Sequence, residues 1–369
     1  MSKSYPLVGH ALEFNKDRSG LFRRGYAEKG NVFAIKLGPK KAAVLIGAEF
    51  QTEFYKITDK ALNMAKPYNF FKPIFGDVAF VANHETYMRQ RPVLYAPFKR
   101  DKMLRYLEVM NEVVVKWLDR LPEEGEMEIT GEMNRLVQDV AGYAFLGEAF
   151  MKEIGEDFWD NYVALGKALD PILPPNLPVP KFIRRNRARK RLVRVLQNII
   201  DRRRAAPQDY DDFLQDFITQ PCADGNPASD EEIIGLIIAF LFAGHETTAG
   251  QAAWGIIQLL QNPAYLADVM AEIQTKFPYG AHVDARSMAN LRLLRWAGDE
   301  TSRMYPSADM SIRVTDEDWE VGGYTIPKGW VVFVAGDVTH RMEGLRNQQN
   351  KTVVLFHYSM LMYSGTKCA

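Results

Sequence analysis

The chain has 369 residues, 47% of them hydrophobic, which is enough to bury a substantial core in one large domain or two ordinary ones. Lysine plus arginine and aspartate plus glutamate both number 46, so the formal net charge is zero. This balance removes the general electrostatic argument for a nucleic-acid partner.

The N-terminal half of the sequence begins with β-forming residues and continues as helices. Residues 31–57 group β-formers between Gly-Pro punctuation and predict a short hairpin. Residues 85–167 carry apolar side chains at three- and four-residue spacing, which is typical of helices. The proline-rich segment 171–180 must be a loop, and a very basic helix is predicted at about 181–204. Residues 206–229 are polar and loop-like.

The best-marked helix begins at Ser229, which has capping-box spacing to Glu232, and it continues to Leu260. Further helices are expected at 264–276 and 286–304. After Pro306 the pattern predicts strands at 310–314, 319–321, 324–326 and 330–334. We therefore predict one mainly α domain with a small β region, whose sheet is built from both ends of the chain.

The cysteines and the N-terminal sequence argue against a disulfide-rich, zinc-binding, secreted or membrane-spanning protein. The two cysteines, Cys222 and Cys368, are too few for a disulfide framework, and neither belongs to a C-x-x-C pair, which excludes a cysteine-type zinc site. The first residues contain no apolar run long enough for a signal peptide or a membrane span. We expect a cytoplasmic protein without a transmembrane anchor.

A motif of six residues, Ala-Gly-His-Glu-Thr-Thr at 243–248, lies in the middle of the long helix. Glycine inside a helix costs about 1 kcal/mol relative to alanine, so Gly244 indicates a close approach or a local distortion. Glu246 and Thr247 would add a proton donor and a hydroxyl at that place. A kinked core helix without chemistry is the alternative. A metalloprotease is excluded, because the second histidine of H-E-x-x-H would fall at Ala249.

Two further motifs pair charges over short spacings. Glu300 and Arg303 are three residues apart, which places both on one helix face. Tyr87 and Arg91 lie in an earlier helical segment, and arginine suits bidentate binding of carboxylates. Taken alone, each motif is more typical of a solvated helix face.

The order and spacing of these motifs resemble those of cytochromes P-450, the haem-thiolate monooxygenases. The I-helix motif A-G-x-E-T-T is followed by the K-helix motif E-x-x-R at Glu300 and Arg303, and then by an extended stretch with Arg313. The C-helix pattern W-x-x-x-R is present with Tyr87 in place of tryptophan and with Arg91 retained. The resemblance covers residues 1–341, for which it implies the cytochrome P-450 fold, incomplete at the C-terminus; residues 342–369 are a divergent tail.

The resemblance implies haem as the cofactor and insertion of one oxygen atom from dioxygen into an apolar substrate. Glu246 and Thr247 would deliver protons for cleavage of the O–O bond, and Gly244 would leave room for dioxygen. Glu300 and Arg303 would form a structural pair. The residues implied in haem binding are Tyr87, Arg91, Ala243 and Arg313. Electrons would come from a separate redox partner, a ferredoxin or a flavoprotein reductase, and we expect a monomer.

One segment resembles a particular subfamily, the sterol 14α-demethylases. Residues 68–76 match their Y-x-x-F-x-P-x-F-G stretch, so Tyr68, Phe71 and Phe75 would line an apolar pocket. Those demethylases usually carry histidine where this chain has Glu246, so a sterol and another lipid both stay open as the substrate.

The family's cysteine motif, F-x-x-G-x-x-x-C-x-G followed by a helix, is absent. Cys368 follows Gly365 with two intervening residues instead of three, and Cys222 lies before the long helix, so we predict that neither binds iron. Either the gene is truncated or frame-shifted, or the chain is a real variant. The alternative function is a catalytically silent binding or interaction protein that keeps the pocket.

The basic run from Lys181 to Arg204 is most simply a solvated helix face, since apolar residues alternate with its cations. Contact with an anionic membrane surface or an acidic redox partner is the other interpretation.

Overall fold

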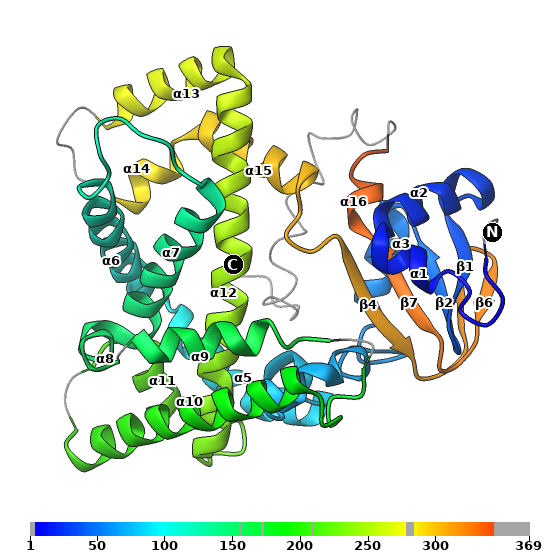
Figure 1. Ribbon diagram of the computed structural model, residues 1–369, viewed down its shortest axis with the longest axis horizontal. Coiled ribbons are helices and arrows are strands. Elements are labelled where there is room, and N and C mark those ends of the chain that lie inside the picture. Colours follow the sequence, from blue (N-terminus) through cyan, green and yellow to red (C-terminus); the bar gives the residue numbers. More distant parts are fainter. Residues whose placement is uncertain (1–3, 155, 171–172, 208–209, 278–283, 343–369) are drawn as a thin grey trace.

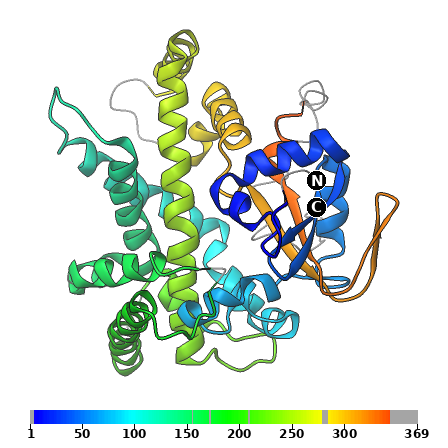
Figure 2. The same ribbon diagram turned by 45° about the vertical axis from the view of Figure 1, so that its right-hand side comes forward.

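The computed structural model describes residues 4–342, apart from 155, 171–172, 208–209 and 278–283. A long helix, α12 (Asp230–Gln261), crosses a large helical region, and a small sheet lies to one side of it (Figures 1 and 2). The helices around α12 are α4 (Lys72–Phe75), α5 (His84–Tyr95), α6 (Arg100–Leu118), α7 (Ile129–Ala141), α8 (Gly147–Glu153), α9 (Glu156–Gly166), α10 (Pro180–Ala205), α11 (Phe213–Thr219), α13 (Pro263–Lys276), α14 (Ala285–Ala289) and α15 (Arg292–Met304). The prediction of a mainly α protein with a small β region is confirmed.

The sheet joins the two ends of the described chain. Its order is β1-β2-β7-β4-β3, with β1 (Val32–Leu37) antiparallel to β2 (Lys40–Leu45) and β2 parallel to β7 (Val331–Ala335). The strand β4 (Met310–Thr315) pairs with β7 and with β3 (Leu62–Asn63), whereas β5 (Trp319–Val321) and β6 (Tyr324–Ile326) form a separate hairpin. The helices α1 (Ala11–Lys16), α2 (Arg18–Lys29), α3 (Ala48–Lys56) and α16 (Gly336–Thr339) belong to this part (Figure 1).

The central helix α12 starts at the predicted capping box. The Ser229 hydroxyl accepts from the Glu232 amide, and the Glu232 carboxylate accepts from the Ser229 amide at 2.9 Å. Among the described helices, α12 is long and apolar enough to cross a membrane, but 56% of its apolar window is buried inside the protein. This burial is that of a core helix.

The first half of α12 approaches α4 so closely that a side chain would not fit between them. A Cβ on Gly235 would lie 2.1 Å from the main-chain oxygen of Phe75 and 3.3 Å from the Val78 side chain. Glycine is therefore required at this crossing, because the obstacle is backbone and cannot rotate away.

Three sequence-based predictions of local structure are wrong. The hairpin ends at Leu45, and most of residues 46–57 form the helix α3, whose Phe54 is buried. Residues 206–229 include the helix α11, which is capped by the Asp212 carboxylate and buries Phe213 and Phe217 on the core. The helix predicted at 286–304 is two helices, α14 and α15, separated at Asn290.

Candidate active site

The motif at 243–248 presents exposed side chains on a core helix. Ala243, Glu246 and Thr247 are exposed, whereas the residues that precede them in α12 are mostly buried. The Thr247 hydroxyl donates to the Ala243 carbonyl at 2.7 Å, and the Ser307 hydroxyl donates to the Thr247 carbonyl at 3.1 Å. These bonds orient Thr247 within a helix that stays α-helical throughout.

The glycine of this motif allows a close approach rather than a distortion. A Cβ on Gly244 would come within 3.0 Å of the Phe145 ring. Phe145 belongs to a short π-helical turn, Gly142–Leu146, that follows α7. The role of Gly244 in leaving room for dioxygen stays a prediction.

An aromatic cluster lies beside the motif. Phe71 stacks on Phe75 with ring centroids 5.2 Å apart and 11° between the planes. Both rings contact the Phe242 ring, with centroid distances of 5.7 Å for Phe71 and 5.6 Å for Phe75. Phe242 immediately precedes Ala243. Phe75 is fully buried and Phe71 half-buried, so Phe75 supports the ring of Phe71. Phe242 is not among the residues predicted from the sequence, although an aromatic residue directly before the motif is a signal for it.

Arg313 is a buried cation on β4. Its side chain donates to the Ile312 carbonyl at 2.8 Å and to the Thr58 hydroxyl at 3.3 Å, and it is hydrogen-bonded to Tyr68. The residue is 7% exposed, and this burial lowers the pKa of the guanidinium. Burial also raises the pKa of the Tyr68 phenol, while the positive charge of Arg313 acts in the opposite direction.

Tyr87 and Arg91 lie on α5 around Tyr95. The hydroxyls of Tyr87 and Tyr95 are hydrogen-bonded, and burial, together with Tyr95, raises the pKa of Tyr87 to about 12. The Arg91 guanidinium lies over the Tyr95 ring, 5.3 Å from its centroid. Asp59 interacts electrostatically with both Tyr87 and Arg313, so these groups face a common region. Asp59 was missed, because nothing in its sequence surroundings marks it.

The haem expected from the resemblance can be tested against these groups. Among the described residues, no carboxylate forms an ion pair with Arg313, although its guanidinium is almost fully buried. Asp59 acts on Arg313 only through its charge, and a buried cation without a carboxylate in direct contact favours an anionic partner. A haem propionate is such a partner, and the exposed strip around Thr247 offers a face for the porphyrin. The chemistry of these residues therefore suits haem, with a buried cation for a propionate and an exposed helix strip for the porphyrin.

Glu300 and Arg303 form the predicted pair on α15. The Arg303 guanidinium binds the Glu300 carboxylate in a bidentate manner, at 2.7 and 2.5 Å, and its third nitrogen donates to the His340 carbonyl at 2.7 Å. The hydrogen bonds to Glu300 raise the pKa of Arg303. The pair therefore attaches α15 to the residues that follow α16.

The described cysteine, Cys222, is far from the motif. Arg89 donates to its sulfur at 3.3 Å and also ion-pairs with Glu232 at the start of α12. Glu232 and Thr247 are separated by about 22 Å along the helix, at about 1.5 Å per residue. Burial raises the pKa of the Cys222 thiol, which disfavours the thiolate. Cys368 lies outside the described residues.

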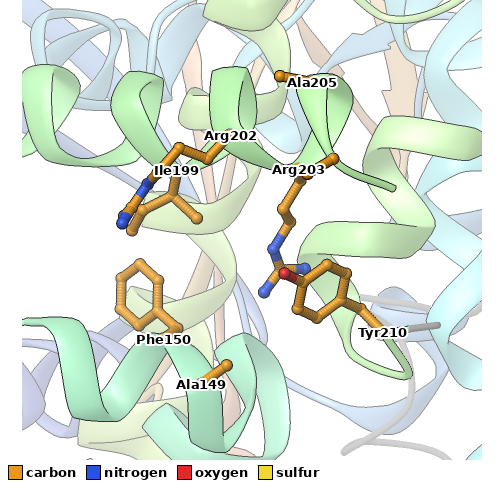
Figure 3. A pocket seen from close by; sticks show the side chains of 8 residues that line it. Ala149, Phe150, Ile199, Arg202, Arg203, Ala205 and Tyr210 are labelled. Carbon is orange, nitrogen blue, oxygen red and sulfur yellow. The ribbon is translucent and has the colours of Figure 1, made fainter. Parts of the chain in front are cut away.

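A cavity of about 320 Å³ lies elsewhere, between the C-terminal part of α10 and α8 (Figure 3). None of the predicted site residues lines it. Arg203, on its wall, is held by a bidentate ion pair with Asp212 and stacks over the Tyr210 ring at 4.1 Å. No group of three or more histidine, cysteine or acidic side chains in the described part of the chain could hold a metal ion.

Comparisons with known proteins identify the family of the chain. The sterol 14alpha-demethylase of Mycolicibacterium vanbaalenii is 30% identical over 342 residues, which are 90% of this chain and 75% of that protein. The sterol 14-demethylase of Arabidopsis thaliana is 29% identical over 91% of this chain and 71% of that protein. The structure of the cyanobacterial CYP120A1, solved with retinoic acid bound, superposes with a TM-score of 0.80 at 23% identity. The match covers 91% of this chain and 76% of that chain. The family model for cytochrome P-450 matches residues 1–344, and the chain belongs to this family of haem-dependent monooxygenases.

Proposed function

We propose that the chain binds an apolar substrate, a sterol or a similar lipid, between the aromatic cluster of Phe71, Phe75 and Phe242 and the exposed strip at Thr247. The observation that carries the proposal is the adjacency of these two features, since Phe242 contacts both Phe71 and Phe75 and precedes the motif by one residue. The sterol 14-demethylases among the relatives support the substrate class.

The proposed roles divide the site into a cofactor edge and a proton route. Haem, when bound, supplies the activation of dioxygen for insertion of one oxygen atom. Arg313, Arg91 and Tyr87 would bind its propionates, with Ala243 against the ring. The Thr247 hydroxyl now donates to the Ala243 carbonyl. In the proposed role it would turn away from that carbonyl and offer its proton to the site.

Glu246 would resupply that proton from the side of α9. Its carboxylate lies 3.9 Å from the position of a Cβ on Gly166. Burial is the main cause of the raised pKa of the Tyr162 phenol, and the negative charge of Glu246 is the second cause. Glu246 therefore lies at the interface between α9 and α12. Gly244 would keep the helix surface open to dioxygen next to these groups.

Family members use separate redox partners and apolar substrates. For this chain we propose a ferredoxin or a flavoprotein reductase as the electron donor, a monomeric state and a cytoplasmic location. Residues 1–341 would form one domain, with 342–369 as a divergent tail.

A catalytically silent binding protein is the second candidate, and the position of Cys222 favours it. No thiol in the described part of the chain lies beside Thr247, because Cys222 sits at the start of α12. We propose that the chain holds haem poorly, since Cys222 lacks the surroundings of an iron ligand and the sequence around Cys368 does not match the family's cysteine motif.

Equilibrium binding of lanosterol, the substrate in the name of a rat relative that is 26% identical, tests the substrate class. We expect saturable binding that Phe71→Ala weakens by about tenfold, because loss of a buried aromatic contact costs about 1.5 kcal/mol. Tyr324→Ala, an exposed aromatic position on β6, is the control and should bind normally. Equal affinities of the wild type and Phe71→Ala would place the sterol elsewhere.

A further inference from the structure

The cavity between α8 and the C-terminal part of α10 has one apolar and one polar wall. Phe150 and Ile199 line it and are only 1% and 5% exposed. Figure 3 shows these two side chains on one side of the space and Arg203 with Tyr210 on the other. An apolar surface with a few fixed polar groups is typical of sites for small molecules.

Both walls are held in place by contacts outside the cavity. The Phe150 ring meets the buried Phe158 ring of α9 edge-on, with centroids 5.4 Å apart. On the other wall, the Arg203 guanidinium is fixed by its bidentate ion pair with Asp212, at 2.7 and 2.9 Å, and Asp212 in turn caps α11. A ligand would therefore enter a space whose walls are already ordered, which lowers the entropic cost of binding.

The volume of the cavity sets the size of its occupant. The cavity measures about 320 Å³, whereas an apolar cavity of about 150 Å³ holds one benzene molecule. The space therefore has room for about two aromatic rings. Ala149 and Ala205, which also line the cavity, are exposed and small, so they leave its mouth open to a flat molecule.

The polar wall favours an aromatic ligand with a hydrogen-bonding group. Arg202 and Arg203 both line the cavity, and guanidinium groups attract aromatic rings, as the stacking of Arg203 on Tyr210 at 4.1 Å illustrates. The Tyr210 hydroxyl points into the space (Figure 3) and has no hydrogen-bond partner among the residues that the structure describes. Arg203 is already paired with Asp212, so this wall does not require an anion.

We propose that this cavity binds an uncharged planar aromatic compound of about two rings that carries one hydroxyl or N–H group. The rings would lie between Phe150 and the arginines, and the polar group would form a hydrogen bond with the Tyr210 hydroxyl. The site is separate from the proposed substrate site, because neither Phe242 nor Thr247 lines the cavity.

Equilibrium dialysis with 2-naphthol, which has two fused rings and one hydroxyl, tests the proposal. We expect saturable binding by the wild type. Decahydro-2-naphthol, which keeps the skeleton and the hydroxyl but is not aromatic, should bind about fivefold more weakly, because it loses the attraction to the cations. Tyr210→Phe should weaken the binding of 2-naphthol by about fivefold and leave that of naphthalene unchanged, because naphthalene has no hydroxyl.

A blocked mouth provides the test of location. The variant A149W/A205W should abolish binding in the cavity, whereas A27W/A267W, with the same change at two exposed helical positions elsewhere, should bind as the wild type does. Hydrogen exchange with 2-naphthol bound should show new protection in residues 147–153 and 196–206.

Four results would overturn the proposal. They are no saturable binding by the wild type, an unchanged affinity of A149W/A205W, an equal loss in A27W/A267W, and protection confined to residues outside α8 and α10. The last result, if it fell on the segments of Phe71 and Phe242, would assign 2-naphthol to the proposed substrate site instead.

Discussion

Gly235→Ala is expected to destabilise the protein by about 3 kcal/mol, although alanine is the better helix former by about 1 kcal/mol. The added methyl group would lie 2.1 Å from the Phe75 carbonyl oxygen, so α12 and α4 would have to separate. Urea unfolding of the wild type and the variant measures the difference.

Gly255→Ala, in the same helix, is the matched control. A Cβ at residue 255 meets no atom within 4 Å, so the substitution keeps only the gain in helix propensity. We expect the free energy of unfolding to rise by up to about 1 kcal/mol. If both variants changed stability in the same direction, the close crossing of α12 and α4 would be refuted.

Arg313→Met is expected to weaken haem binding by about tenfold or more. A charge-assisted hydrogen bond to a propionate contributes about 1.5–3 kcal/mol, and about 1.4 kcal/mol is tenfold in affinity. Quenching of tryptophan fluorescence during a haem titration provides the affinity. Arg295→Met, an exposed position on α15, should bind haem as the wild type does.

Arg313→Met should leave the free energy of unfolding within about 1 kcal/mol of that of the wild type. The buried guanidinium has a desolvation cost that the charge of Asp59 offsets only in part, and methionine removes that cost along with the hydrogen bonds to Thr58 and Ile312. A loss of several kcal/mol with unchanged haem affinity would instead make Arg313 a purely structural residue.

The sequence predicted the elements that carry their own local signals. The capping box at Ser229 and the Asn-Pro at its end locate α12 to within a residue, and the hairpin of β5 and β6 is predicted at its observed bounds. The helix α11 was missed because it is short and stands in a polar segment. Its local signal is an aspartate cap followed by Phe213 and Phe217 one turn apart. This signal is weak in the sequence, because the helix is stabilised mainly by packing of those two rings on the core.

The site was predicted where a motif is contiguous and missed where it depends on tertiary contact. Glu300 and Arg303 pair as their spacing indicates, but the third partner is the His340 carbonyl, which no sequence pattern could identify. Phe242 joins the aromatic cluster, and Asp59 approaches Arg313, only because separate segments fold together. The same holds for Gly235, whose requirement comes from a carbonyl on another helix.

This chain has the cytochrome P-450 fold, and we propose that its site accepts haem but that, among the described residues, no cysteine is placed to bind the iron. The carbon monoxide difference spectrum of the dithionite-reduced chain, after addition of haem, tests it most directly. We expect no Soret band at the position typical of thiolate-ligated haem. A thiolate-type band would contradict it, because Cys222 or Cys368 would then have to be the iron ligand.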